Sequence, residues 1–189
     1  MVTTILLILL GIVIIAAIAY FIIIFNGLIR MKHNIEQAWS NIDVLLKQRY
    51  DELPKLVSVC EGYMKHERAV LENVTRARSR LDNAGSDQEA MDANNAITSA
   101  LRSLFAVSEN YPDLKADRAF RQLQSRISDL ENQIADRREL YNSAVNLFNI
   151  RIEQFPDVFV ANMMNLAPRT LWQIEPEHRE DVDISFSYT

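Results

Sequence analysis

The stretch KQRYDELPKLVSV, Lys47 to Val59, decides the fold, because it places a proline inside a pattern that otherwise indicates one uninterrupted helix. Apolar residues recur through it at alternating spacings of three and four, the period of an amphipathic helix. Pro54 lacks a backbone N–H and its ring crowds the preceding turn, so it either bends a helix or ends it. RYDELPKL contains no glycine or asparagine that would form a tight turn. We therefore expect a kink at Pro54 and not a chain reversal.

The N-terminal segment ILLILLGIVIIAAIAYFIIIF, Ile5 to Phe25, is apolar throughout apart from Gly11. At ~1.5 Å rise per residue it would be roughly 31 Å long, which matches a hydrocarbon core of about 30 Å. No positive charge precedes it, and Ile22 to Phe25 extend it past the small-residue pair Ala17 and Ala19, so it does not resemble a cleaved signal peptide. The sequence predicts an uncleaved transmembrane anchor over residues 1–27.

The charges around this anchor predict its orientation. No lysine or arginine precedes the span, whereas Arg30 and Lys32 follow it closely. Positively charged flanks remain on the cytoplasmic side of a membrane. We therefore expect a single-pass membrane protein, with its N-terminus outside and its C-terminal domain in the cytoplasm.

Downstream of the anchor the periodicity predicts three long helices and one short one. The first carries an apolar stripe from Leu28 to Leu81, through Pro54, and the stripe is narrow enough for bundle or coiled-coil packing. The second covers about 87–109, preceded by a capping box formed by Ser86 and Glu89. The third covers roughly 114–154 and the short fourth 158–166. Residues 167–189, with two prolines and dense charge, are expected to be an extended or mobile tail.

The predicted fold class is therefore all-α, with an N-terminal single transmembrane helix followed by an antiparallel bundle of long helices over residues 28–166. A four-helix up-and-down bundle is the alternative if Pro54 reverses the chain. Without a reversal, the second helix is too short to cover the membrane-proximal half of the first. We therefore expect an uncovered apolar surface there that binds a second copy or another protein, formed by Ile35, Trp39, Ile42 and Leu46.

The same residues carry a resemblance to a known family. From the anchor to about Ala161 the chain resembles the LemA family of bacterial membrane-anchored proteins, in order and with matching spacing. The resemblance implies a membrane helix followed by a bundle of long helices, and it implies no defined biochemical activity. The segments that carry it include Gln37-Ala38-Trp39-Ser40, Arg49-Tyr50-Asp51-Glu52-Leu53-Pro54, Tyr111-Pro112-Asp113-Leu114 and Phe155-Pro156.

Metal, cofactor and nucleophile motifs are weak in this sequence. Glu175 and His178 have the spacing of a di-metal ligand pair, but Pro176 separates them and no second such pair exists. Cys60 lies on the apolar stripe, where a packed thiol is the better interpretation than a nucleophile. An enzyme would need several polar side chains to meet in one pocket. The candidates for such a site are His66, Glu67, Asp43 and Arg49. We expect no catalytic, cofactor or metal site.

Charge patterning gives little evidence for ligands. The net charge of −5 with mixed signs argues against nucleic-acid binding. Arg76, Arg78 and Arg80 do not share one helix face and are interpreted as solvated charges near a helix end. The segment 182–186 alternates like a strand that could add to a partner's sheet.

The partners expected are therefore the lipid bilayer and either a second copy or another protein, with no small-molecule substrate. The predicted function is a non-catalytic scaffold that organises itself or partner proteins at the membrane, with a sensor or adaptor as the alternative.

Overall fold

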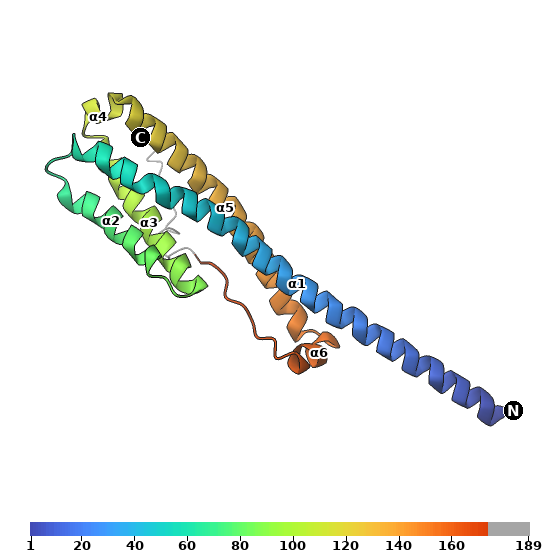
Figure 1. Ribbon diagram of the computed structural model, residues 1–189. Helices are drawn as coiled ribbons and strands as arrows, with labels where there is room; N and C mark the ends of the chain where they lie inside the picture. The colour runs from blue at the N-terminus through green and yellow to red at the C-terminus, as the bar shows by residue number, and fades with distance from the viewer. Residues whose placement is uncertain (174–189) are drawn as a thin grey trace, which may run out of the picture. The chain divides into compact units, whose positions relative to one another are not determined.

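The computed structural model describes residues 1–173, and these form helices joined by turns, with no β-strand among them. This confirms the all-α class. The elements are α1 (Val2–Glu61), α2 (Arg68–Asp82), α3 (Asp87–Ser108), α4 (Pro112–Ala116), α5 (Arg118–Glu153) and α6 (Asp157–Met163) (Figure 1).

The helices belong to two compact units. One unit comprises residues 1–44 and 134–171, so it contains the N-terminal part of α1, the C-terminal part of α5, and α6. The other comprises residues 45–133 together with the chain from Trp172 onward, and contains the rest of α1 and α5 with α2, α3 and α4. We call them the anchor unit and the central unit.

Pro54 lies inside α1, so the chain does not reverse at this residue and the alternative of a reversal at Pro54 is wrong. Pro54 itself is exposed, whereas Leu53 and Leu56 beside it are fully buried. The pyrrolidine ring therefore lies on the solvent side of α1, and the apolar face of the helix continues past it.

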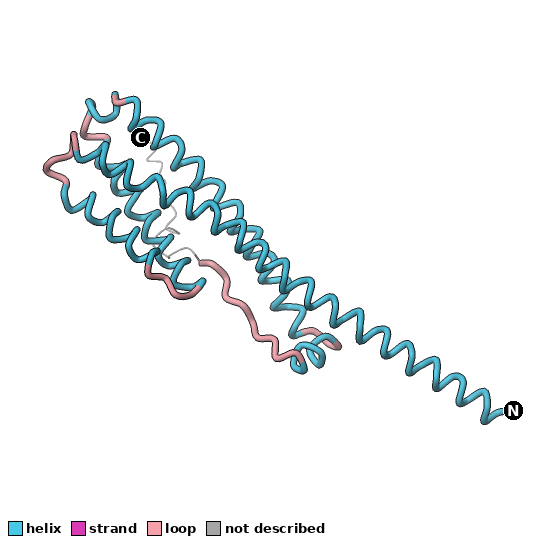
Figure 2. The backbone as a smooth tube through the Cα atoms, viewed as in Figure 1, coloured by secondary structure: helices cyan, strands magenta, loops and turns pink. Residues whose placement is uncertain are grey.

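The chain reverses instead at residues 62–67, where a single helix over 28–81 was expected. α1 ends at Glu61, and α2 runs back beside it in the central unit, joined by a short loop (Figure 2). The pattern hid this reversal because Cys60, Met64, Leu71 and Val74 all face the same core, so apolar spacing continues through the turn. The expected stripe included Tyr63, which is exposed, whereas its neighbour Met64 is buried, so the stripe differs from the structure at the turn.

Two tyrosine hydroxyls hold the 62–67 turn to α4 and its flanks. Tyr63 donates to Asp117 Oδ2 at 3.0 Å, and Tyr111 donates to Glu67 Oε1 at 3.2 Å. The other carboxylate oxygen of Asp117 accepts from the backbone N–H groups of Ala119 and Phe120 at 2.7 and 3.0 Å, so this residue also caps α5. One aspartate therefore joins the α1–α2 turn to the start of α5.

These hydrogen bonds predict a pH-dependent stability. The backbone N–H of Phe120 and the hydroxyl of Tyr63 lower the pKa of Asp117. A carboxylate with a lowered pKa stabilises the fold above its unfolded-state pKa, about 3.9, and loses that contribution as pH falls through the lower folded-state value. Asp117→Ala should therefore lower the thermal midpoint at pH 7, and the difference from wild type should shrink as the pH falls below about 4. An equal difference at pH 7 and pH 2 would contradict this assignment.

The surface expected to bind a partner is largely covered by the chain itself. Ile35 and Ile42 are buried in the anchor unit, where the ring of Trp39 contacts that of Tyr141 from α5 at a centroid distance of 5.6 Å. Leu46 is buried in the central unit. The expectation assumed that only the helix predicted over about 87–109 could pack on the apolar face of α1. In the structure α5 also packs on that face. The inference of an exposed apolar stripe at these four residues is therefore wrong.

Residues 166–173 have no regular secondary structure, and the described part of the tail, expected to be extended or mobile, is held by hydrogen bonds. In the anchor unit the Asn149 side chain bonds both backbone groups of Arg169, at 2.8 and 2.9 Å. In the central unit Trp172 is buried, and its indole N–H donates to Asn95 Oδ1 at 3.1 Å. The strand-like segment 182–186 and the pair Glu175 and His178 lie outside the described residues.

Candidate functional site

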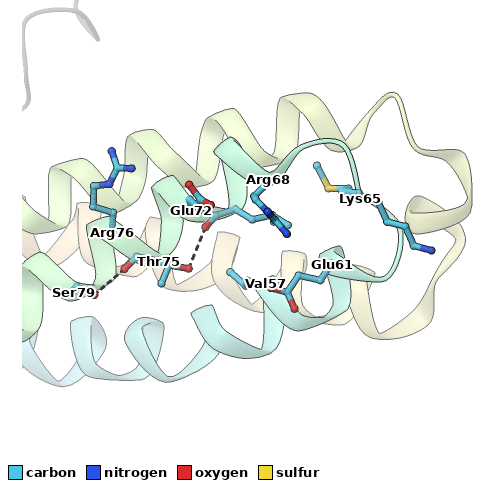
Figure 3. Close-up of a pocket in the computed structure, with 10 residues that line it drawn as sticks. Val57, Glu61, Lys65, Arg68, Glu72, Thr75, Arg76 and Ser79 are labelled. Carbon is cyan, nitrogen blue, oxygen red and sulfur yellow. Dashed lines mark hydrogen bonds between the residues drawn. The ribbon is translucent and has the colours of Figure 1, made fainter.

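A groove of about 710 Å³ lies on the central unit between the end of α1 and α2 (Figure 3). Val57, Met64 and Leu71 supply its apolar surface. Its remaining lining is polar or charged, from Glu61, Lys65, Arg68, Glu72, Thr75, Arg76 and Ser79.

The hydroxyl groups in this groove are engaged by the helix that carries them. Thr75 donates to the carbonyl of Leu71, and Ser79 donates to that of Thr75, both at 3.1 Å. The charged side chains are therefore the groups best able to bind another molecule. Lys65, Arg68 and Arg76 are exposed and outnumber the two carboxylates of the groove.

The cationic surface continues along α2 into a second hollow of about 520 Å³ beside α3, which shares Arg76 and adds Arg80. Arg76 and Arg80 are four residues apart on one face of α2, and Arg68 lies about 80° around the helix from Arg76, on the side that lines the first groove. The sequence analysis compared only Arg76, Arg78 and Arg80 and missed this row. We call the exposed cations Lys65, Arg68, Arg76 and Arg80 the α2 basic row.

Arg78 belongs to a different contact. Its guanidinium lies over the Tyr50 ring, 3.9 Å from the centroid, and the Tyr50 hydroxyl donates to Asp82 Oδ2 at 2.6 Å. The hydrogen bond to Asp82 raises the pKa of Tyr50. Arg78 therefore fastens α2 to α1, in place of the solvated role predicted for it.

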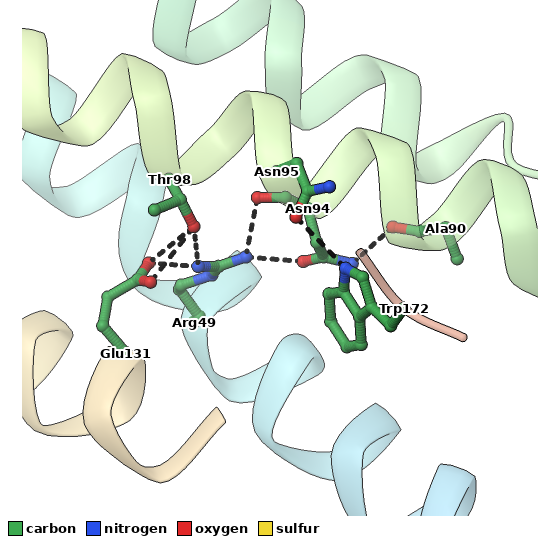
Figure 4. Close-up of polar contacts among 7 residues, drawn as sticks. All are labelled: Arg49, Ala90, Asn94, Asn95, Thr98, Glu131 and Trp172. Atoms are coloured by element: carbon green, nitrogen blue, oxygen red, sulfur yellow. Dashed lines mark hydrogen bonds and ion pairs between the residues drawn. The ribbon is translucent and has the colours of Figure 1, made fainter. Parts of the chain in front are cut away.

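A buried polar network crosses the middle of the central unit (Figure 4). Arg49, only 1% exposed, donates to Thr98 Oγ1 at 3.0 Å and to Asn94 Oδ1 at 2.6 Å, and forms an ion pair with Glu131. Thr98 also donates to Glu131 Oε2 at 3.1 Å. Burial lowers the pKa of Arg49, while the charge of Glu131 opposes that shift. The network joins α1, α3 and α5.

These groups suit a structural role better than catalysis. The Nη1 and Nη2 groups of the guanidinium donate to fixed partners on α3 and α5, while its buried Nε has no hydrogen-bond partner. No open hollow among those described on residues 1–173 is lined by Arg49 or Glu131. The sequence analysis missed Asn94, Thr98 and Glu131. Each directly follows a buried apolar residue that already fills the helix period, namely Ala93, Ile97 and Leu130, so the pattern gave no signal for them.

The residues considered for an enzyme do not form one site. Arg49 lies about 18 Å along α1 from Glu61, where the turn that carries His66 and Glu67 begins. Glu67 accepts from Tyr111, His66 is exposed, and Asp43 belongs to the anchor unit. Within residues 1–173 no three His, Cys, Asp or Glu side chains gather as a metal site.

Cys60 is fully buried, and burial raises the pKa of its thiol to about 12. Its thiolate population at neutral pH is therefore negligible, as expected for a packed side chain and not for a nucleophile.

Comparison with known proteins now adds to this geometry. The LemA family model matches residues 38–186, which is most of the chain. The chain belongs to the LemA family. The LemA protein of Metamycoplasma hominis is 32% identical over 161 residues, covering 85% of this chain and 74% of that protein. The resemblance noted in the sequence is thereby confirmed.

More distant relatives of this LemA-family chain carry a different name. Magnetosome protein MamQ 2 of Paramagnetospirillum magneticum is 21% identical over 189 residues, covering 86% of this chain and 70% of that protein. Magnetosome protein MamQ of Magnetospirillum gryphiswaldense is 19% identical over 163 residues, covering 72% and 60%. The α2 basic row and the Arg49 network both lie within the region that the LemA family model matches.

Among residues 1–173 of this LemA-family chain, one helix, α1, is long and apolar enough to cross a membrane. Residues 2–23 of α1 are exposed except for Gly11, which is half-buried. This segment therefore fits a membrane anchor.

Proposed function

We propose that this LemA-family chain is a single-pass membrane protein whose helical units act as a non-catalytic scaffold for protein partners at the membrane. One observation supports it most strongly. The apolar segment of α1 has no cover within the anchor unit, yet the same helix continues without a loop into that unit's core through Ile24, Leu28 and Ile35. A soluble core helix would be buried along its apolar length.

The proposed orientation is that of the positive-inside rule. Arg30 and Lys32 closely follow the apolar segment, and this positive flank supports a location of the helical units on the cytoplasmic side of a bacterial inner membrane. A reporter that works only in the cytoplasm should be active when fused to the C-terminus. A reporter that works only outside the cytoplasm should be inactive at the same position.

We place the partner site on the α2 basic row and its groove. The occupant we propose is an acidic, partly apolar segment of another protein. The groove combines three cations and two carboxylates with an apolar surface, in a chain whose net charge is −5. Complementary charge steers such an encounter, and the apolar surface contributes burial once the segment is bound.

The experiment is crosslinking of the full-length protein in native membranes, followed by identification of the crosslinked chains. Arg68→Glu with Arg76→Glu should remove the partner crosslinks, because it replaces attraction by repulsion. The matched control is Arg102→Glu with Arg118→Glu, which changes charge equally at exposed positions of the same unit outside the groove. Partner recovery should also fall as salt is raised.

Crosslinks that survive the groove variant, or that are lost equally in the control, would contradict this site. Recovery of only a second copy would assign the scaffold to self-association. Recovery of a distinct enzyme or receptor, whose activity follows occupancy of the groove, would favour the sensor or adaptor function. Trp39→Ala, the variant suggested by the sequence alone, is less informative since Trp39 packs inside the anchor unit.

A further inference from the structure

Large apolar side chains are exposed together at the end of α5 and on α6. Phe155 is 82% exposed, Phe159 67% and Met163 59%. They are spaced four residues apart, and the rings of Phe155 and Phe159 meet edge to face at a centroid distance of 5.9 Å. We call these three residues the α6 apolar patch. Isolated exposed apolar residues are ordinary, but a contiguous patch indicates an interaction site.

The patch is held in place from its other side. Asp157, Val160 and Ala161 of α6 are buried. Asp157 forms an ion pair with Arg151, and the N–H of Val158 donates to the carbonyl of Gln154 at 2.8 Å, which closes the turn onto α5. The three exposed side chains are therefore fixed outward by the buried face of the same short helix.

The anchor unit places this patch next to the end of the apolar segment of α1. The guanidinium of Arg151 lies 3.7 Å from the position that a Cβ on Gly27 would occupy. Ile24, three residues before that glycine, and Leu28, directly after it, are buried, whereas residues 12–23 are exposed. α6 follows the end of α5 directly in the same unit (Figure 1). The helix thus changes from uncovered to covered where the end of α5 reaches it.

We infer that the α6 apolar patch inserts into the membrane at the headgroup and upper acyl level, as a second contact of the anchor unit with the lipid bilayer. The inference rests on anchoring by α1, and it requires neither the scaffold role nor the proposed orientation. An uncovered apolar helix requires acyl chains around residues 5–23, so the bilayer surface lies close to Gly27. The patch stands at that depth.

The surrounding charges agree with an interfacial depth. Arg30 is exposed just beyond Gly27 and is placed to contact lipid phosphates. Glu153 and Asn162, both exposed beside the patch, limit insertion to the interface, where polar groups retain water. A protein partner could cover the patch at any distance from the bilayer surface. A bilayer can cover it only if the patch lies at the depth where α1 leaves the membrane.

The test uses the full-length protein in phosphatidylcholine vesicles, with Phe159→Trp as the probe. Acyl chains brominated near the headgroup should reduce the added tryptophan fluorescence by about twofold, with emission shifted to the blue. The background of Trp39 and Trp172 is subtracted with the parent protein. Leu140→Trp is the matched control, since Leu140 is 56% exposed on the same unit but lies about 20 Å further along α5. It should not be quenched.

Phe159→Trp fluorescence that is quenched no more than that of Leu140→Trp, in protein that floats with the vesicles, would overturn the inference and leave the α1 anchor intact. A blue shift without quenching would also overturn it, because a protein surface and not lipid would then cover the patch. Protein that fails to float with the vesicles would overturn both the α1 anchor and the patch contact.

Discussion

Replacing Arg49 with alanine is expected to lower the free energy of unfolding of the central unit by ~3–5 kcal/mol, the cost of removing one partner of a buried ion pair. The loss leaves Glu131, 27% exposed at its side chain, without its cation, and leaves Asn94 Oδ1 without its donor. Chemical denaturation of the full-length protein in detergent, followed by circular dichroism, measures the change.

The control removes both charges together. Arg49→Met with Glu131→Met replaces the ion pair by apolar groups of similar length, so no buried carboxylate is left without a partner. Most of the stability should return, and a double-mutant cycle gives the interaction between the two residues. A double variant as unstable as Arg49→Ala would show that packing around Arg49, and not the unpaired charge, carries the effect.

Replacing Trp172 with alanine is expected to release the segment 166–173 from the central unit. Trp172 is 3% exposed and its indole N–H is bonded to Asn95, whose amide group donates to the Gln173 carbonyl at 3.0 Å. Truncation of a buried tryptophan costs ~3–5 kcal/mol of stability. We expect the other contacts of this short non-helical segment to contribute less than that, so the segment should detach. Trypsin should then cut after the exposed Arg169 much faster than in wild type.

Trp172→Phe is the matched control for this variant, because it retains a buried ring and loses only the indole hydrogen bond. Its cleavage rate should fall between those of wild type and Trp172→Ala. Equal cleavage of all three proteins would show that Trp172 does not hold the segment. Since the hydrogen bonds of Asn149 to Arg169 belong to the anchor unit, Asn149→Ala tests that attachment separately.

The sequence predicted those features that depend on local periodicity and caps. The helix expected over about 87–109 is α3, and the Ser86 side chain accepts from the Glu89 N–H as a capping box requires. The continuous helix through Pro54 follows from the absence of turn residues around it. Each of these depends on residues within a few positions of one another.

The features that sequence reasoning missed depend on contacts between distant residues. The turn at 62–67 is held by Asp117 and Tyr111, which lie more than 40 residues downstream. The cover over Ile35 and Ile42 comes from α5, about 100 residues later in the chain. The docking of Trp172 was missed because a single aromatic residue in a charged tail has no local period to identify it.

The anchor unit is built from two segments that lie far apart in the chain, residues 1–44 and 134–171, and this has a consequence for biosynthesis. Residues 45–133, which make up nearly all of the described central unit, are complete before residues 134–171 are translated. Until then Ile35 and Ile42 have no intramolecular cover, although the preceding apolar segment is already available for membrane insertion. The central unit is therefore expected to fold first on the ribosome, and the anchor unit to close last around a helix already in the bilayer. During that interval the nascent chain exposes an apolar stripe next to the membrane, where a chaperone or a second nascent copy would find it.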